Sequence, residues 1–162
     1  MKSLAAKLID ILEAEPPKDT AIICDLDGCL APNEPRQKFV DDDDWDAYHK
    51  SGTELPPAPW CLELVKKFAT DHKILFVSAR PGEYYDATMK WLEDDCGLPT
   101  ESFDLFLKSD DTLQDTEFKA KCYQEEIRDK YDVTFVIDDR PRVVDVWRQL
   151  GLICLQPNFI DH

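Results

Sequence analysis

The stretch AIICDLDGCLAP, residues 21–32, decides the fold of this chain. Four apolar residues lead directly into two carboxylates, Asp25 and Asp27, which are separated by one residue and followed by Gly28. An apolar run that does not alternate with polar residues is typical of a strand buried on both faces, as in a parallel sheet covered by helices. The sequence therefore predicts a buried strand that carries two acids to one point at its carboxyl end.

Further apolar runs of strand length recur along the chain. They are KILFVS (73–78), VTFVID (133–138) and LICLQ (152–156), with FDLFL (103–107) as a weaker candidate. Helical patterns lie between them, at residues 57–71, 83–97, 115–131 and 141–151. This alternation of strands and helices predicts an α/β doubly wound fold with a parallel central sheet.

One segment, residues 32–59, interrupts the alternation between the first strand and its helix. It contains five prolines and the acidic run Asp41–Asp44, and it shows little periodic apolar pattern. Long insertions in compact domains are usually lids or binding loops, so we expect a small cap insertion here. We interpret the acidic run as a solvated face, with a metal role left open. The whole chain, residues 1–162, is expected to form a single domain.

The composition limits the class of protein. A chain of 162 residues with 43% hydrophobic residues is long enough for a packed core. No apolar run approaches the roughly 20 residues that a membrane span needs, so no membrane association is expected. The N-terminal residues predict an amphipathic helix with Leu4, Leu8, Ile11 and Leu12 on one face. A signal peptide would need a longer apolar core.

The net charge of −15 argues against a broad electrostatic grip on nucleic acid. It does not exclude recognition of a strand end or a nucleotide by a few local arginines. The six cysteines form no CxxC pair and show no zinc-like spacing. They are expected to be free buried thiols in a reducing compartment, which predicts a cytoplasmic location.

Polar residues follow three of the predicted strands directly. In an open parallel sheet the carboxyl ends of the strands meet at one crevice, so these side chains are expected to converge. Each of them alone has an ordinary structural explanation, such as a helix cap or a loop residue. Together, four carboxylates would repel one another unless a cation lay among them, which predicts Mg²⁺. The residues are Asp25 and Asp27, Ser78 and Arg80, and Asp138 and Asp139.

The motifs DLDGCLA, VSAR and VIDDR resemble motifs one, two and four of the haloacid dehalogenase-like (HAD) phosphatases. The stretches VSARPGEYYDATMKWLEDDCGLP and VTFVIDDRPRVVDVWRQLGLICLQ are most similar to the 3′-phosphatase domain of phage polynucleotide kinase. The resemblance runs from about Asp25 to Gln156. It implies the HAD-like Rossmannoid three-layer fold, with residues 32–59 as the small cap.

The resemblance also implies a mechanism. Asp25 would attack phosphorus and form an aspartyl-phosphate, and Asp27 would protonate the leaving hydroxyl and later activate water. Mg²⁺ would be bound by Asp25, by the main-chain carbonyl of Asp27, and by Asp138 or Asp139. Which of the last two is the direct ligand stays open.

The same resemblance implies how the phosphoryl group is held. Ser78 and Lys119 would contact the phosphoryl oxygens, with Lys119 at the matching distance before the last motif. Arg36 and Arg80 would bind the substrate phosphate or its neighbours, where a planar guanidinium suits an oxyanion. Cys29 departs from the family, which has threonine or valine there. A thiol is a weaker hydrogen-bond donor, but it leaves both catalytic carboxylates untouched.

We therefore expect a Mg²⁺-dependent phosphatase that removes a 3′-phosphate from a polynucleotide end or a nucleotide. The acidic cap departs most from the family pattern and leaves a different small phosphorylated metabolite as an alternative substrate. A third hypothesis is an inactive relative that binds a partner through its acidic surface. The chain has no GxxxxGK[ST] phosphate loop, so a separate kinase or ligase partner is left open.

Overall fold

The computed structural model describes residues 3–6, 8, 17–109 and 111–158. The predicted N-terminal helix is described only at residues 4–6 and 8, which are helical, and Ile11 and Leu12 lie outside the described residues. In the part of the chain that is described, no helix combines the length and the apolar character that crossing a bilayer requires.

The centre of the fold is a five-stranded sheet in which every pairing is parallel. Its strand order is β3-β2-β1-β4-β5, so the first strand lies in the middle. The predicted α/β fold with a parallel central sheet is confirmed. The strands are β1 (Asp19–Cys24), β2 (Lys73–Pro81), β3 (Phe103–Lys108), β4 (Tyr131–Ile137) and β5 (Cys154–Leu155).

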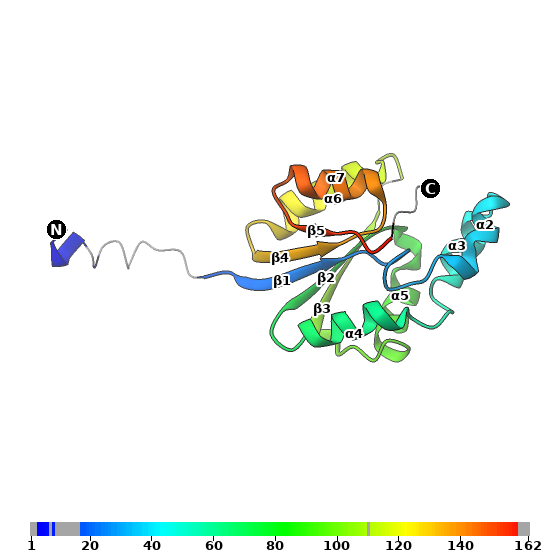
Figure 1. Cartoon of the computed structure of the whole chain (residues 1–162), viewed down its shortest axis with the longest axis horizontal. Coiled ribbons are helices and arrows are strands. Elements are labelled where there is room, and N and C mark those ends of the chain that lie inside the picture. The colour runs from blue at the N-terminus through cyan, green and yellow to red at the C-terminus, as the bar shows by residue number, and fades with distance from the viewer. Residues whose placement is uncertain (1–2, 7, 9–16, 110, 159–162) are drawn as a thin grey trace.

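Helices cover both faces of the sheet, which gives three layers (Figure 1). Helices α4 (Pro59–Phe68) and α5 (Tyr85–Asp94) lie on one face, and α6 (Asp115–Cys122) and α7 (Pro141–Gln149) lie on the other. Both α4 and α7 begin with proline, whose fixed φ and missing N–H suit the first helical position. A single turn of π-helix, Tyr123–Ile127, follows α6 directly.

The core explains why the strands do not alternate polar with apolar residues. In β1, Ile22 and Cys24 pack into the cluster on the α4 and α5 side, with Trp91. Ala21 and Ile23 pack into the cluster on the α6 and α7 side. Successive side chains of a strand point to opposite faces, so a strand with a helix layer on each side needs apolar residues at every position.

Most elements differ by a few residues from the extent of their sequence patterns, and three of these differences have a structural reason. Strand β3 is a full strand. Its sequence pattern is weaker because the strand lies at the edge of the sheet and is only partly buried. Strand β2 continues past Ser78 to Pro81, with a register shift against β3 between these two residues. The helix predicted at 115–131 ends at Cys122 and passes into the wider π turn.

Residues 32–59, the segment expected to form the cap (the cap segment), lie at the carboxyl end of the strands (Figure 1). The cap segment holds a short turn η1 (Glu34–Arg36) and two short helices, α2 (Gln37–Asp41) and α3 (Trp45–Ser51). The part of this segment that follows α3 is attached to helix α5, because Trp91 Nε1 donates to the Leu55 carbonyl at 2.9 Å. The acidic run is exposed, as predicted, and Asp44 caps α3 by accepting from the Ala47 amide at 3.0 Å.

Candidate active site

The end of β1 places Asp25 beside the end of β4. The amide of Asp25 donates to the Ile137 carbonyl at 2.9 Å, which continues the β1–β4 ladder by one residue. Asp138 and Asp139 follow Ile137 directly. The carboxylates that the sequence predicted at two separate strand ends therefore share one edge of the sheet.

Gly28 allows this close approach. It has φ +97°, a conformation that L side chains rarely adopt, and a Cβ atom there would lie 2.0 Å from Asp139 Oδ2. The turn that it starts is closed by the Gly28 amide, which donates to the Ala31 carbonyl at 2.8 Å. Glycine is thus required at position 28 for two reasons: the positive φ of the backbone, and the lack of space for a side chain beside the carboxylate of Asp139.

Lys119 provides the positive charge at the centre of the acids. Its Nζ lies 2.9 Å from Asp25 Oδ1 and 2.7 Å from Asp138 Oδ2, and its side chain is almost completely buried. A capping box between Gln114 and Glu117 fixes the start of α6 and so the position of Lys119. Burial alone would lower the pKa of this ammonium group, but the two carboxylates outweigh it and raise the pKa.

The two adjacent acids after β4 have different environments. Asp138 accepts from Lys119, from Trp147 Nε1 at 3.1 Å and from the Arg140 amide at 3.3 Å, which fits an anchoring role. Asp139 instead faces Asp25 and Cys29, and one ligand atom from each of these three residues lies within 4.8 Å of the others.

These three buried side chains could hold a metal ion. Burial raises the pKa of Asp25 well above its usual range, and the neighbouring acids add to this against the Lys119 charge. Burial and the nearby Asp138 raise the pKa of Asp139 to about 6. Crowded carboxylates of this kind fit a divalent cation, which would favour their charged forms.

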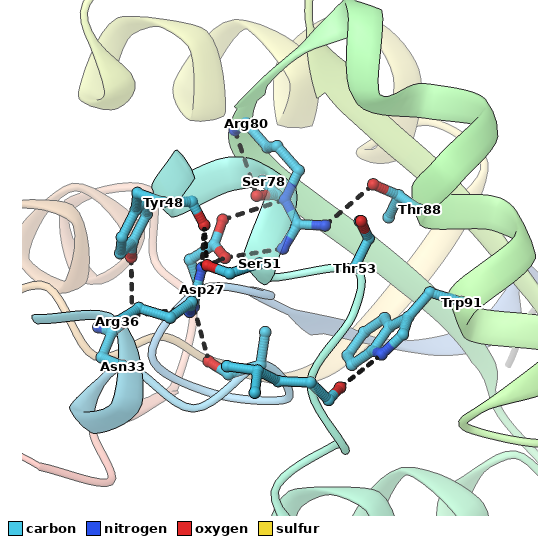
Figure 2. Close-up of polar contacts among 12 residues, drawn as sticks. Asp27, Asn33, Arg36, Tyr48, Ser51, Thr53, Ser78, Arg80, Thr88 and Trp91 are labelled. Atoms are coloured by element: carbon cyan, nitrogen blue, oxygen red, sulfur yellow. Dashed lines mark hydrogen bonds and ion pairs between the residues drawn. The ribbon is translucent and has the colours of Figure 1, made fainter. Parts of the chain in front are cut away.

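Asp27 is held differently, by two guanidinium groups (Figure 2). Its Oδ1 accepts from Arg36 Nη1 at 2.8 Å and from Arg80 Nη2 at 2.7 Å. Burial would raise the pKa of Asp27, but the charges of Arg80 and Arg36 outweigh it and hold the pKa well below its usual range. In this structure Asp27 is therefore a charged acceptor, in contrast to Asp25.

Arg36 has no donor left for a substrate. Its Nε donates to the Pro32 carbonyl, Nη1 to Asp27 and the Tyr48 carbonyl, and Nη2 to the Ala31 carbonyl and Asn33 Oδ1. These are all five N–H groups of a guanidinium. In this structure Arg36 ties the cap segment to Asp27, so the expected contact with the substrate phosphate would require one of these hydrogen bonds to break.

Arg80 comes from the extended end of β2 and contacts both carboxylate oxygens of Asp27. Its Nη1 donates to Thr88 Oγ1 at 3.0 Å, and Nε lies 3.3 Å from Asp27 Oδ2 (Figure 2). It also lines the pocket described below. Ser78 accepts from the Arg80 amide at 3.3 Å and lines the same pocket.

Gly52, at the end of α3, is a site residue that the sequence did not reveal. A Cβ atom there would lie 2.7 Å from Arg36 Nη1, 2.7 Å from Arg80 Nη2 and 3.2 Å from Asp27 Oδ1. Its backbone is helical, so glycine is needed here for space and not for a positive φ. A lone glycine in a loop-like segment gave no sequence signal of this role.

A pocket of about 290 Å³ opens at this edge of the sheet. The cap segment contributes three aromatic side chains to it, of which Trp45 keeps 45% of its surface exposed. The lining residues are Asp25, Asp27, Trp45, Tyr48, His49, Ser78, Ala79, Arg80, Pro81, Lys108, Asp115, Lys119, Arg140, Arg142 and Val143. The predicted residues Asp25, Asp27, Ser78, Arg80 and Lys119 are all among them.

Three charged residues of the pocket, Lys108, Asp115 and Arg142, were not expected there from the sequence, whereas Arg140 follows Asp139 directly at the end of a predicted strand. Lys108 ends β3, Asp115 begins α6, and Arg140 and Arg142 lie at the start of α7. They come together only because the parallel strands end at one edge. The one available signal was their position after predicted strands or at helix starts.

Comparison with known proteins places this geometry in a class. The fold is similar to that of a haloacid dehalogenase-like hydrolase, SP0104 from Streptococcus pneumoniae, with a TM-score of 0.56, 15% identity, and coverage of 85% of this chain and 84% of that chain. The model of the family described as "Polynucleotide kinase PNKP phosphatase domain" matches residues 19–162. The chain belongs to this family and is a HAD-type phosphatase.

Two relatives share this resemblance. A "Putative bifunctional polynucleotide kinase/RNA ligase" from Autographa californica nuclear polyhedrosis virus is 35% identical over 135 residues, covering 82% of this chain and 18% of that protein. A chain from the structure of a Pnkp1/Rnl/Hen1 complex has a TM-score of 0.74 and 28% identity, covering 91% of this chain and 49% of that chain. The chain thus spans less than half the length of these relatives.

Proposed function

We propose that the protein removes a 3′-phosphate from a polynucleotide end or a nucleotide, with Mg²⁺ as cofactor. The observation that carries this is the convergence of two acids at one pocket, with Asp25 beside Lys119 and Asp27 between two arginines. The family match and the polynucleotide kinase relatives support a nucleotidyl 3′-phosphate over another phosphate ester.

Asp25 is the proposed nucleophile. Burial raises the pKa of Asp25 in the metal-free protein, and Lys119 together with a bound cation would favour the charged carboxylate, which is the form that attacks phosphorus. Ser78 and Lys119, on the pocket wall, are the proposed partners of the phosphoryl oxygens. Attack forms the aspartyl-phosphate as the bond to the leaving 3′ oxygen breaks.

Asp27 is the proposed acid and base. It must deliver a proton to the leaving oxygen, yet two guanidinium charges keep it ionised in the free protein. A phosphate dianion that draws Arg80 toward itself would weaken that hold and raise the pKa of Asp27. We propose that Arg80 is shared in this way, and that Arg36, with all its donors engaged, positions Asp27 and does not touch substrate.

A divalent ion fits the cluster of Asp25, Cys29 and Asp139. We propose Mg²⁺ with the carboxylates of Asp25 and Asp139 and the main-chain carbonyl of Asp27 as ligands, and with Asp138 as the anchor of Lys119. The ion would offset the charge of the phosphoryl group during transfer.

The cap segment supports a nucleotidyl substrate. Trp45 is exposed at the pocket, and the ring of His49, which also lines the pocket, lies 6.4 Å from that of Trp45. Exposed aromatic rings stack nucleobases.

The wider setting is also a proposal. The relatives combine kinase and ligase names, so we propose that a kinase or ligase activity accompanies this domain, on the same or a separate polypeptide. All six cysteines are free, which supports a reducing, cytoplasmic setting.

The test is phosphate release from a matched panel in the presence of Mg²⁺, with Asp25→Asn as the blank. The panel is a 3′-phosphorylated oligonucleotide, its 5′-phosphorylated twin, the 3′- and 5′-mononucleotides and an aryl phosphate. We expect turnover of the 3′-phosphorylated substrates well above their 5′ twins. Activity on the aryl phosphate alone would keep a phosphatase and reject the nucleotidyl 3′-phosphate.

A further inference from the structure

The pocket is more positive than the protein that contains it. Five cationic side chains line it, and only three carboxylates do. Two of the cations, Arg80 and Lys119, are paired with Asp27 and Asp25 at the reaction centre. The remaining three, Lys108, Arg140 and Arg142, also line the pocket, in a chain whose net charge is −15.

Those three cations surround a single acid, Asp115. Arg140 is bonded to it, whereas Arg142 Nη2 lies 3.5 Å and Lys108 Nζ 3.6 Å from its carboxylate oxygens. The last two distances are long for hydrogen bonds, so both cations keep donors that are not committed to Asp115. One carboxylate among three cations leaves a local surplus of two positive charges.

These cations share a pocket with Asp25, which indicates the kind of ligand that would fit there. Lys108, Asp115 and Arg142 come from β3, α6 and α7, and they line the same pocket as Asp25 and Lys119. When the terminal phosphate of a substrate lies against Asp25, these cations could therefore bind a second anionic group of the same substrate within the pocket. In a nucleotide with a 3′-phosphate, the next phosphate along the strand is the one on the 5′ oxygen of the same nucleoside.

We infer that Lys108 and Arg142, held by Asp115, form a second phosphate subsite that binds the phosphate on the 5′ side of the terminal nucleoside. This inference rests on the proposed 3′-phosphatase function and specifies its substrate as a nucleotide that carries both phosphates, as a strand end does. It also explains how so acidic a protein would hold a nucleic-acid end: it needs two local cations and no broad basic surface.

The experiment compares four substrates with wild-type protein and Mg²⁺. They are a nucleoside 3′-monophosphate, a nucleoside 3′,5′-bisphosphate, a 3′-phosphorylated dinucleotide, and the same dinucleotide with an uncharged methylphosphonate linkage. The variants are Arg142→Gln and Lys108→Gln. Arg128→Gln is the matched control, because its side chain is also 57% exposed, as that of Arg142 is, and it lies outside the pocket.

For the wild type we expect kcat/KM to be about tenfold higher for the charged dinucleotide than for the mononucleotide, as one charge-assisted contact would give. Arg142→Gln and the methylphosphonate should each remove this preference, and together they should remove no more than either alone. Arg128→Gln should keep the wild-type preference. If kcat/KM for a nucleoside 3′,5′-bisphosphate equals that for the dinucleotide, the 5′-phosphate alone accounts for the preference. If kcat/KM is higher for the dinucleotide, the rest of the strand adds contacts.

Two results would overturn the subsite while keeping the proposed function. One is equal turnover of the charged and the methylphosphonate dinucleotides by the wild type. The other is a loss of preference in Arg128→Gln as large as in Arg142→Gln, which would indicate a general charge effect. Failure of the wild type to release phosphate from all of these 3′-phosphorylated substrates would reject the proposed function itself, and the subsite with it.

Discussion

At the scale of single residues, Lys119 is the charge on which the site depends. It lies between Asp25 and Asp138, and both acids are buried. Removing one partner of a buried ion pair leaves an uncompensated charge, which costs much more than an exposed pair contributes. Lys121, two residues further along the same helix, is exposed and provides a built-in comparison.

We predict that Lys119→Gln lowers the free energy of unfolding by about 3 kcal/mol and eliminates measurable phosphate release. Lys121→Gln should change neither quantity beyond the usual effect of a surface substitution. Urea unfolding of the metal-free variants and a phosphate-release assay measure the two effects. Equal behaviour of the two variants would contradict the role given to Lys119.

Cys29 adds a soft ligand atom to a site of hard oxygen ligands. Its thiol lies in the cluster with Asp25 and Asp139. Thiolate ligands favour Zn²⁺ and Cd²⁺ over Mg²⁺. We predict that Cys29→Thr keeps Mg²⁺-dependent activity and weakens Cd²⁺ binding at least about tenfold.

The readout for Cys29 is the sulfur-to-cadmium charge-transfer absorption during a titration, which does not depend on turnover. Cys61→Ser is the control, because that buried thiol lies outside the cluster. A Cd²⁺ affinity unchanged in Cys29→Thr would mean that the thiol does not reach the ion. A large loss of activity would mean that the thiol has a further role.

At the scale of elements, the cap segment is attached to the reaction centre through Asp27. Arg36 and the end of α3 meet Arg80 of β2 there, and Gly52 provides the space. Another glycine offers a matched comparison: a Cβ on Gly82 would meet its nearest atom at 3.6 Å, an ordinary contact.

We predict that Gly52→Ala lowers kcat/KM at least about tenfold, because the new methyl group displaces guanidinium groups whose placement sets the geometry of Asp27. Gly82→Ala should retain near wild-type activity. Steady-state kinetics of both variants on one substrate measures the difference. If Gly52→Ala were as active as Gly82→Ala, the contact between α3 and the two arginines would not matter for catalysis.

The elements also show where sequence reasoning succeeds. The strands of the sheet interior were found because burial on both faces demands unbroken apolar runs, as in Ile22 to Cys24. Strand β3 gave a weaker pattern because an edge strand needs less apolar surface. The π turn after Cys122 gave no signal, since a helical periodicity does not distinguish turn widths.

At the scale of the whole molecule, the limits of sequence reasoning concern what long-range contacts decide. Asp25, Asp27, Ser78, Arg80 and Lys119 could be brought to one edge from the topology and the family motifs. The contact partner of each side chain could not be predicted in this way. Arg36 and Arg80 both contact Asp27, whereas Asp138 anchors Lys119 and Asp139 is the candidate metal ligand. Such pairings depend on side-chain directions that no spacing encodes.

The clustered acids also make a prediction for the whole fold. Burial raises the pKa of Asp139 from 3.8 to about 6, and that of Asp25 in the same direction. Between pH 4 and 6 these two acids therefore hold more protons in the folded metal-free protein than in the unfolded chain, so their contribution to stability falls as the pH rises through this range. A cation that binds the ionised acids reverses this loss.

We predict that the increase in Tm caused by millimolar Mg²⁺ is small at pH 5 and grows as the pH rises through about 6. Asp139→Asn should reduce this increase at every pH. Thermal unfolding with and without Mg²⁺ measures it. An increase in Tm that is equal at pH 5 and pH 7.5 would contradict the assignment of these acids to the metal site.

The proposed mechanism requires Asp25 to take the phosphoryl group from a nucleotidyl 3′-phosphate. An acid quench during turnover of an oligonucleotide whose 3′-phosphate is radiolabelled, followed by mass spectrometry of the labelled peptide, tests this step directly. We predict that the label is found on Asp25 in the wild type and that Asp25→Asn carries none. Release of phosphate without any labelled protein, or turnover that persists in Asp25→Asn, would contradict it.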